Sequence, residues 1–141
     1  MNVLLAGILS CGCVSLADGP LWTPAQAYIN TKAECSQSSD PANCRHTRET
    51  WPRDYHDAVA GQYQGQRNVA FCLSTGCDMA ISRDEVLGCA WRIVIVDSKH
   101  RELDSTDETN LKHFCGPDYL DETGQQAAKK EAERFLAMLG S

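Results

Sequence analysis

Six cysteines that follow an uncharged apolar segment constrain this chain more than any other feature. Residues 1–17 carry no charged side chain and are mainly apolar from Val3 onward. Ser15 and Ala17 place small residues at the −3 and −1 positions of a cleavage before Asp18, where signal peptidase requires them. The sequence therefore predicts a secretory signal peptide at residues 1–17 and a periplasmic or secreted protein.

Two alternatives for this segment remain open. The residues could form a buried N-terminal helix, because they are too short for a bilayer span, which takes about 20 apolar residues. Alternatively, Cys11 follows Ile8-Leu9-Ser10 and could be lipidated, which would make the protein a lipoprotein. We expect no stable membrane span after signal removal.

Cleavage at residue 17 would leave an even number of cysteines, which is typical of exported proteins with disulfides. Three bridges would each contribute roughly 2 to 4 kcal/mol by restricting the unfolded chain. We expect one local bridge around the turn at Asp40-Pro41. A second bridge should join Cys89 to either Cys72 or Cys77. The third should join Cys115 to the cysteine of that pair that is left. The six candidates are Cys35, Cys44, Cys72, Cys77, Cys89 and Cys115, and the local bridge is Cys35–Cys44.

Zinc is a weaker use of the same cysteines. A structural zinc site needs cysteines two to four residues apart, matched by a second such pair or by histidines. Four residues separate Cys72 from Cys77, but eight separate Cys35 from Cys44, and no histidine pair has finger spacing. We therefore expect neither a metal ion nor another cofactor.

Size and charge limit the domain count and the partners. A chain of 141 residues is long enough for one buried core but not for two. Its 13 Lys and Arg against 19 Asp and Glu give a net charge of −6, which opposes the counterion release that drives binding to nucleic acids. We expect no nucleic-acid partner.

The first part of the mature chain differs in composition from the rest. Residues 18–50 are rich in Ser, Asn and Asp, and Pro20, Pro24 and Pro41 interrupt any long element. They predict an extended or loosely helical arm that contains the Cys35–Cys44 loop. Residues 51–141 are expected to form an α-helical domain.

Four helices are expected after the arm. Residues 55–74 favour a helix that glycines at 61 and 65 weaken. In residues 82–96 we expect a central helix capped by Ser82 with Glu85 as its capping-box partner, although the β-branched run at 93–96 would favour a strand by propensity alone. Residues 105–115 and 121–139 have the apolar spacing and end signals of helices. Together with the cysteines, these patterns predict a small all-α, disulfide-stabilised domain.

The central stretch resembles one family of helical repeats. Ile81-Ser82-Arg83-Asp84, followed by Ala90-Trp91, is similar to the second half of a Sel1-type repeat, a relative of the tetratricopeptide repeats. The turn glycines of that family fall on Asp78 and Ala80 here. The resemblance implies a helical hairpin over residues 70–96, with the arm and the C-terminal helices as caps.

The same resemblance implies a protein-binding function. Helical-hairpin repeats bind segments of other proteins and need no cofactor. The partner would be another protein, in the cell envelope, with this chain serving as adaptor, accessory subunit, or inhibitor or immunity protein. The candidate binding residues are the aromatic side chains of Trp51, Tyr55, Tyr63 and Trp91.

A small secreted hydrolase is the alternative function. His46, His56 or His113 could act as a general base beside a carboxylate such as that of Asp54. No local spacing of a nucleophile, a base and an acid is visible among these residues, and pairing of the six cysteines would leave none as a nucleophile. The sequence therefore favours a binding protein over an enzyme.

Overall fold

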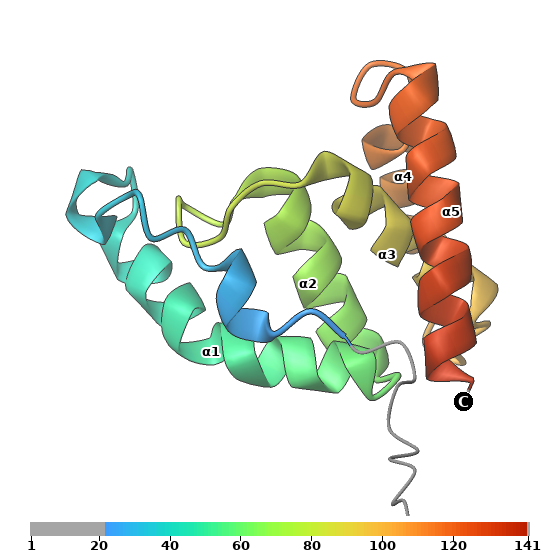
Figure 1. Ribbon diagram of the computed structural model, residues 1–141, viewed down its shortest axis with the longest axis horizontal. Coiled ribbons are helices and arrows are strands. Elements are labelled where there is room, and N and C mark those ends of the chain that lie inside the picture. Colours follow the sequence, from blue (N-terminus) through green and yellow to red (C-terminus); the bar gives the residue numbers. More distant parts are fainter. Residues whose placement is uncertain (1–21, 141) are drawn as a thin grey trace, which may run out of the picture.

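The computed structural model describes residues 22–140, which form an all-α domain (Figure 1). The predicted signal peptide and Cys11 lie outside this range. Within it, the only β contact is an isolated bridge between Ile29 and Ile81, so the expected helical class is confirmed. The elements are the short 3-10 helices η1 (Ala25–Tyr28) and η2 (Cys35–Gln37), and the helices α1 (Pro41–Val59), α2 (Tyr63–Thr75), α3 (Glu85–Asp97), α4 (Ser105–Phe114) and α5 (Glu122–Leu139).

Helix α1 begins earlier than the composition suggested. A loose arm was expected to reach residue 50, but Asp40 caps a regular helix by accepting a 2.9 Å hydrogen bond from the Asn43 amide. Pro41 occupies the first turn, where its missing N–H costs nothing. The step that we interpreted as a loop turn is therefore a helix start. Segment 22–40 runs back along α1 (Figure 1).

Helices α2 and α3 form the expected hairpin, with one correction at its turn. Helix α2 ends at Gly76, as the sequence predicted. The cap of α3 is Asp84, whose carboxylate accepts a 2.9 Å hydrogen bond from the Leu87 amide, and not Ser82. Ser82 lies outside the helix because its amide donates to the carbonyl of Tyr28 at 2.8 Å. The β-branched run at residues 93–96 is helical.

Two helical glycines allow the helices to approach closely. A Cβ on Gly88 of α3 would lie 2.3 Å from the hydroxyl oxygen of Ser74 in α2. A Cβ on Gly65 of α2 would lie 2.6 Å from the backbone nitrogen of Ala58 in α1. Gly65 was expected to weaken its helix, but it serves as the contact point between α1 and α2.

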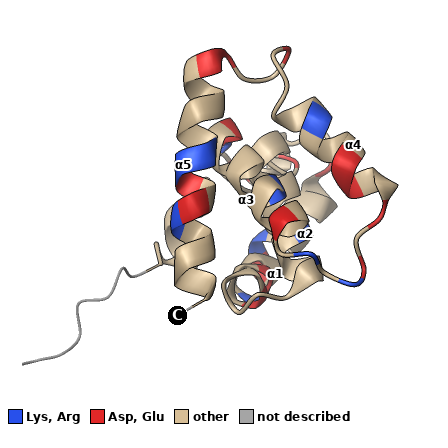
Figure 2. Cartoon of the chain, turned by 90° about the vertical axis from the view of Figure 1, so that its right-hand side faces the viewer, with Lys and Arg blue, Asp and Glu red and all other residues tan. Residues whose placement is uncertain are grey.

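Helix α3 is central, as its broad apolar surface predicted. It packs against α2, α4 and α5. Its Trp91 is buried, lies 4.8 Å from the ring centre of Phe135 in α5 and stacks on Trp22 at 5.6 Å. Helix α5 covers this core with one face, and positive and negative residues alternate along it (Figure 2). Its outer face is therefore a solvated surface of mixed charge.

Three disulfides link cysteines within residues 22–140. The expected local bond joins Cys35 to Cys44. The other two join Cys72 to Cys77 and Cys89 to Cys115, so our expectation that Cys89 pairs with the turn was wrong. Cys89 lies on the part of α3 that packs against the end of α4. The turn after α2 instead brings the Cα of Cys77 within 4.8 Å of that of Cys72.

Candidate functional site

The aromatic residues selected as binding candidates belong mainly to the core. Trp51 and Trp91 are each 1% exposed, and Tyr55 is 5% exposed. The indole nitrogen of Trp51 donates a 2.8 Å hydrogen bond to the carbonyl of Ala25. Only Tyr63 is partly exposed. Three of the four candidates are therefore packing residues, because large aromatic side chains at helical spacing bury their apolar surface in the core.

The histidines of the alternative hydrolase are not brought together. His46 and His56 are both in α1, about 15 Å apart along the helix axis. The side chain of His56 is 80% exposed, and its nearest carboxylate is that of Asp57, at 3.5 Å. Asp54 contacts Arg53 instead. His113 lies in α4 and is exposed against the ring of Phe114.

The turn after α2 has an unusual backbone. Gly76 has a φ of 83°, and it is followed by Cys77, Asp78 and Met79 with φ values of 42°, 57° and 69°. We call residues 76–79 the left-handed turn. Residues other than glycine are disfavoured at these positive φ values, because their Cβ lies too close to the backbone. Such conformations persist only where the surroundings impose them, and they concentrate at functional sites.

Bonds at both ends impose the left-handed turn. The Cys72–Cys77 disulfide holds its start against the last turn of α2. The amide of Asn43 in α1 donates a 2.5 Å hydrogen bond from its side chain to the carboxylate of Asp78. Beyond the turn, the carbonyl of Ala80 accepts a 2.9 Å hydrogen bond from the Asn30 amide. The turn is thus fixed to α1, to α2 and to the N-terminal segment.

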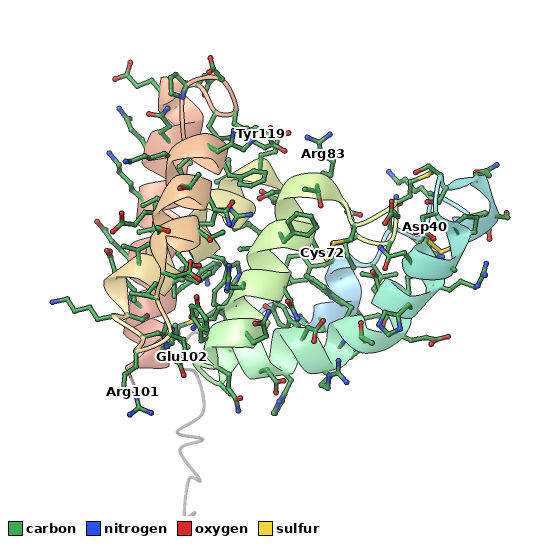
Figure 3. The ribbon with its side chains drawn as sticks, turned by 180° about the vertical axis from the view of Figure 1, so that it is seen from behind. Asp40, Cys72, Arg83, Arg101, Glu102 and Tyr119 are labelled. Carbon is green, nitrogen blue, oxygen red and sulfur yellow. A yellow bond between two sulfur atoms is a disulfide. The ribbon has the colours of Figure 1, made fainter. Side chains whose placement is uncertain are left out.

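One of the largest exposed apolar side chains precedes this turn and another belongs to it. Within residues 22–140, Phe71 is 52% exposed and Met79 38% exposed, and they are the only large hydrophobic residues in that class. Phe71 precedes Cys72, and Met79 follows Cys77 by two residues. Figure 3 shows Cys72 on the part of α2 that faces the following loop, with Arg83 above it. We call Phe71, Met79 and the left-handed turn the turn surface.

A polar network holds the opposite end of the α2–α3 hairpin. Asp107 of α4 is buried, and its carboxylate accepts a 2.5 Å hydrogen bond from the Tyr63 hydroxyl and pairs with Arg67 at 3.2 Å. His100 contacts the amide oxygen of the buried Gln66 at 2.8 Å. Burial, followed by the hydrogen bond to Asp107, raises the pKa of Tyr63 to about 12. No spacing in the sequence marks these residues as neighbours.

Arg92 is buried, and no acidic side chain within residues 22–140 forms a salt bridge with it. Its guanidinium lies 4.0 Å over the ring of Phe114, and neither its Nε nor its Nη2 has a hydrogen-bond partner. Burial lowers the pKa of Arg92 to about 10. The guanidinium therefore stays charged at neutral pH, and no salt bridge compensates its lost hydration.

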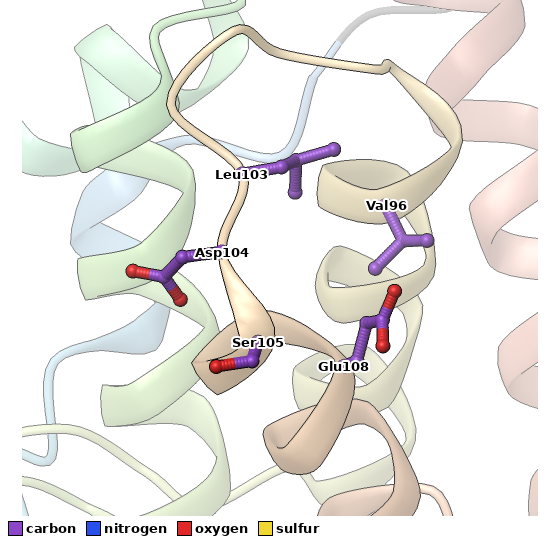
Figure 4. Close-up of a pocket in the computed structure, with 5 residues that line it drawn as sticks. All are labelled: Val96, Leu103, Asp104, Ser105 and Glu108. Carbon is purple, nitrogen blue, oxygen red and sulfur yellow. The ribbon is translucent and has the colours of Figure 1, made fainter.

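A shallow hollow lies between the end of α3 and the start of α4. Val96 and Leu103 line it on one side, with Asp104, Ser105 and Glu108, and its volume is about 310 Å³ (Figure 4). The carboxylate of Asp104 points away from that of Glu108 and caps α4. The backbone hydrogen bond from Thr106 lowers the pKa of Asp104. Asp104 is thus already engaged in the fold.

Other kinds of site are not found in the part of the chain that the structure describes. Among residues 22–140, no group of three metal-ligating side chains is arranged to hold an ion. None of the helices in this part of the chain is long and apolar enough to cross a bilayer. No family model, curated protein or solved structure matches the sequence or the fold. The turn surface is the candidate site that remains from the geometry.

Proposed function

We propose that this chain is a protein-binding module that docks a partner protein on the turn surface. The observation that carries the proposal is the position of Phe71 and Met79, the two exposed large apolar residues, beside a turn held in a disfavoured conformation. Aromatic residues and methionine are enriched where proteins contact one another. Methionine also adapts its shape to a partner because its side chain is unbranched and flexible.

The rigidity of the turn surface supports this proposal. Met79 projects from a backbone fixed by the disulfide and by Asn43, and Phe71 projects from a helix. A surface that is already ordered loses little conformational entropy on binding, which favours affinity. Trp51, Tyr55 and Trp91, which we first selected, would have to leave the core to contact a partner.

The resemblance to Sel1-type repeats is compatible with this function. The family has a glycine where this chain has Asp78, and Asp78 adopts a φ of 57°, which glycine favours. We propose that residues 70–96 are a divergent unit of this type. We further propose that the partner lies in the cell envelope, because three disulfides suit an oxidising compartment.

Site-specific photo-crosslinking tests the docking surface. A photoreactive amino acid at position 71 is compared with the same residue at position 133, since Glu133 is exposed on the far helix α5. We expect a discrete adduct with one envelope protein from position 71 and none from position 133. Equal adducts from both positions, or none from position 71, would contradict the proposal.

Binding to the purified partner then gives a quantitative test. We expect Phe71→Ser with Met79→Ser to weaken the affinity at least tenfold, because buried aromatic anchors contribute more than about 1.4 kcal/mol. Glu133→Ser is the matched control and should leave the affinity unchanged. An unaltered melting temperature in all variants would show that the loss arises at the surface and not from unfolding.

A further inference from the structure

The Cys72–Cys77 disulfide differs from the other two in how little chain it closes. Its cysteines are 5 residues apart, against separations of 9 and 26 for the other bonds. A short loop restricts the unfolded chain less than a long one. Cys72 also lies in the last turn of α2, so the bond joins no two helices. It can therefore open while the helices stay packed.

The oxidised form holds a backbone that the reduced form can leave. Cys77, Asp78 and Met79 have consecutive positive φ values although none of them is glycine. The bond holds Cys77 against α2, and this fixes the residues after it in the disfavoured region. Once the bond is open, residues 77–79 can return to ordinary conformations. This relaxation favours the reduced form of this bond over the reduced forms of the other two.

We propose that Cys72–Cys77 is a redox-sensitive clasp that a dithiol reductant opens while the other two disulfides stay intact. Each of the other two bonds contains a cysteine that is almost fully buried, Cys44 at 0% and Cys89 at 1% exposure, whereas Cys72 and Cys77 are each 8% exposed. We take Cys77 as the leaving group, because the hydroxyl of Thr75 lies 3.9 Å from its sulfur and can turn from the Phe71 carbonyl, to which it donates at 2.9 Å, to stabilise a thiolate formed there.

The exchange proceeds in two balanced steps. A thiolate of the reductant attacks the Sγ of Cys72, a new S–S bond forms, and Cys77 leaves as a thiolate. The second thiol of the reductant then attacks the mixed disulfide and releases Cys72. The two electrons and two protons of the dithiol end on Cys72 and Cys77 as two thiols, and the reductant becomes a disulfide.

Opening would change the turn surface and little else. Ala80 and Ile81 remain held by the Asn30 amide and by the bridge to Ile29, so the movement is confined to the left-handed turn. The Asn43–Asp78 hydrogen bond would be lost, and Met79 would no longer be fixed relative to Phe71. In this respect the inference rests on the proposed function, since the clasp would then control docking.

Reduction of the unaltered protein tests the clasp without any partner. The protein is equilibrated with graded ratios of reduced to oxidised dithiothreitol, the free thiols are alkylated, and the peptides are quantified by mass spectrometry. We expect the 72–77 pair to be half reduced at a ratio at least tenfold lower than either other pair, with the far-ultraviolet circular dichroism unchanged. Joint reduction of all three pairs, or loss of helix with the first, would overturn the inference.

Two variants of one residue isolate the backbone effect. Met79→Gly and Met79→Ala remove the same side chain beyond Cβ, but only glycine tolerates the φ of 69°. We expect Met79→Gly to need about fivefold more reducing conditions than Met79→Ala, because relief of the left-handed strain stabilises the oxidised form. Equal midpoints would overturn the strain argument. A partner that binds equally to both redox forms would overturn control of docking and leave the proposed function intact.

Discussion

The two ends of the α2–α3 hairpin are held by opposite means. At one end, a disulfide and a hydrogen bond to α1 maintain a left-handed turn that is unfavourable in itself. At the other, Asp107, Tyr63 and Arg67 satisfy one another in a partly buried network. The polar network stabilises the fold, whereas the backbone conformation of the turn destabilises it and holds an exposed surface in place. Stability and the candidate function therefore lie at opposite ends of one hairpin.

Of the two ends of the hairpin, the polar network should show the larger loss of stability on substitution. Asp107→Ala should lower the free energy of unfolding by about 3 kcal/mol, because removing one partner leaves the Tyr63 hydroxyl and the Arg67 guanidinium without an acceptor. Urea unfolding measures this change. Glu108→Ala is the control, since Glu108 is the exposed neighbour in the same helix, and should change stability by less than about 0.5 kcal/mol. Similar values for both variants would refute the assigned role of the network.

Much of the fold could be predicted from local signals, and the errors have physical causes. Periodicity placed the hairpin and α5, and it placed α3 despite the β-branched residues at 93–96, because burial on all sides outweighs propensity. The start of α1 was missed because Asp40-Pro41 is equally typical of a turn and of a helix cap followed by proline. The sequence predicted Ser82 as the cap in place of Asp84. The hydrogen bond that holds Ser82 outside the helix goes to Tyr28 in a distant segment, so no local signal indicated it.

The candidate site was far less predictable than the fold. Trp51 and Trp91 were selected for their type, but aromatic residues at helical spacing serve the core more often than a partner. The left-handed turn has no glycine at residues 77–79, so nothing local revealed its backbone. The 72–77 pairing depends on that turn and was missed with it. One signal was available: Gly76 between two closely spaced cysteines marks a reversal of the chain.

A smaller effect of opposite sign is expected at Arg92, the buried arginine near the network. Arg92→Met should raise the free energy of unfolding by about 1.5 kcal/mol, because it removes an unpaired charge and replaces it with a side chain of similar length. The gain is reduced by loss of the contact with Phe114. Arg67→Met, which breaks a pair with Asp107, should destabilise in the same assay. Destabilisation by both variants would show that Arg92 has a stabilising partner.

Removing the Cys72–Cys77 bond at the turn end should lower the stability less than removing Asp107 from the network. Cys72→Ala with Cys77→Ala should lower stability by about 1 kcal/mol, since chain entropy gives about 2 kcal/mol for so short a loop and relief of the left-handed turn offsets part of it. The Cys89–Cys115 bond closes a longer loop, so Cys89→Ala with Cys115→Ala should lower stability by about 3.5 kcal/mol. Thermal unfolding of both pairs measures the difference. A loss of about 2 kcal/mol for the first pair, which is the value from chain entropy alone, would mean that the turn carries no strain.

The smallest effect is a pH dependence that only the network end should show. The pKa of Tyr63 is raised to about 12 in the folded protein, against about 10 in an unfolded chain. The folded state therefore retains a proton that the unfolded state releases. Its stabilising contribution is complete below pH 10 and is lost as the pH rises to 12. Tyr63→Phe removes this contribution, so the unaltered protein should lose its stability advantage over the variant as the pH rises from 10 to about 12, as melting temperatures would show. Parallel curves for the two proteins would mean that the Tyr63 hydroxyl is not held by Asp107, and that the two ends of the hairpin differ less than their geometry indicates.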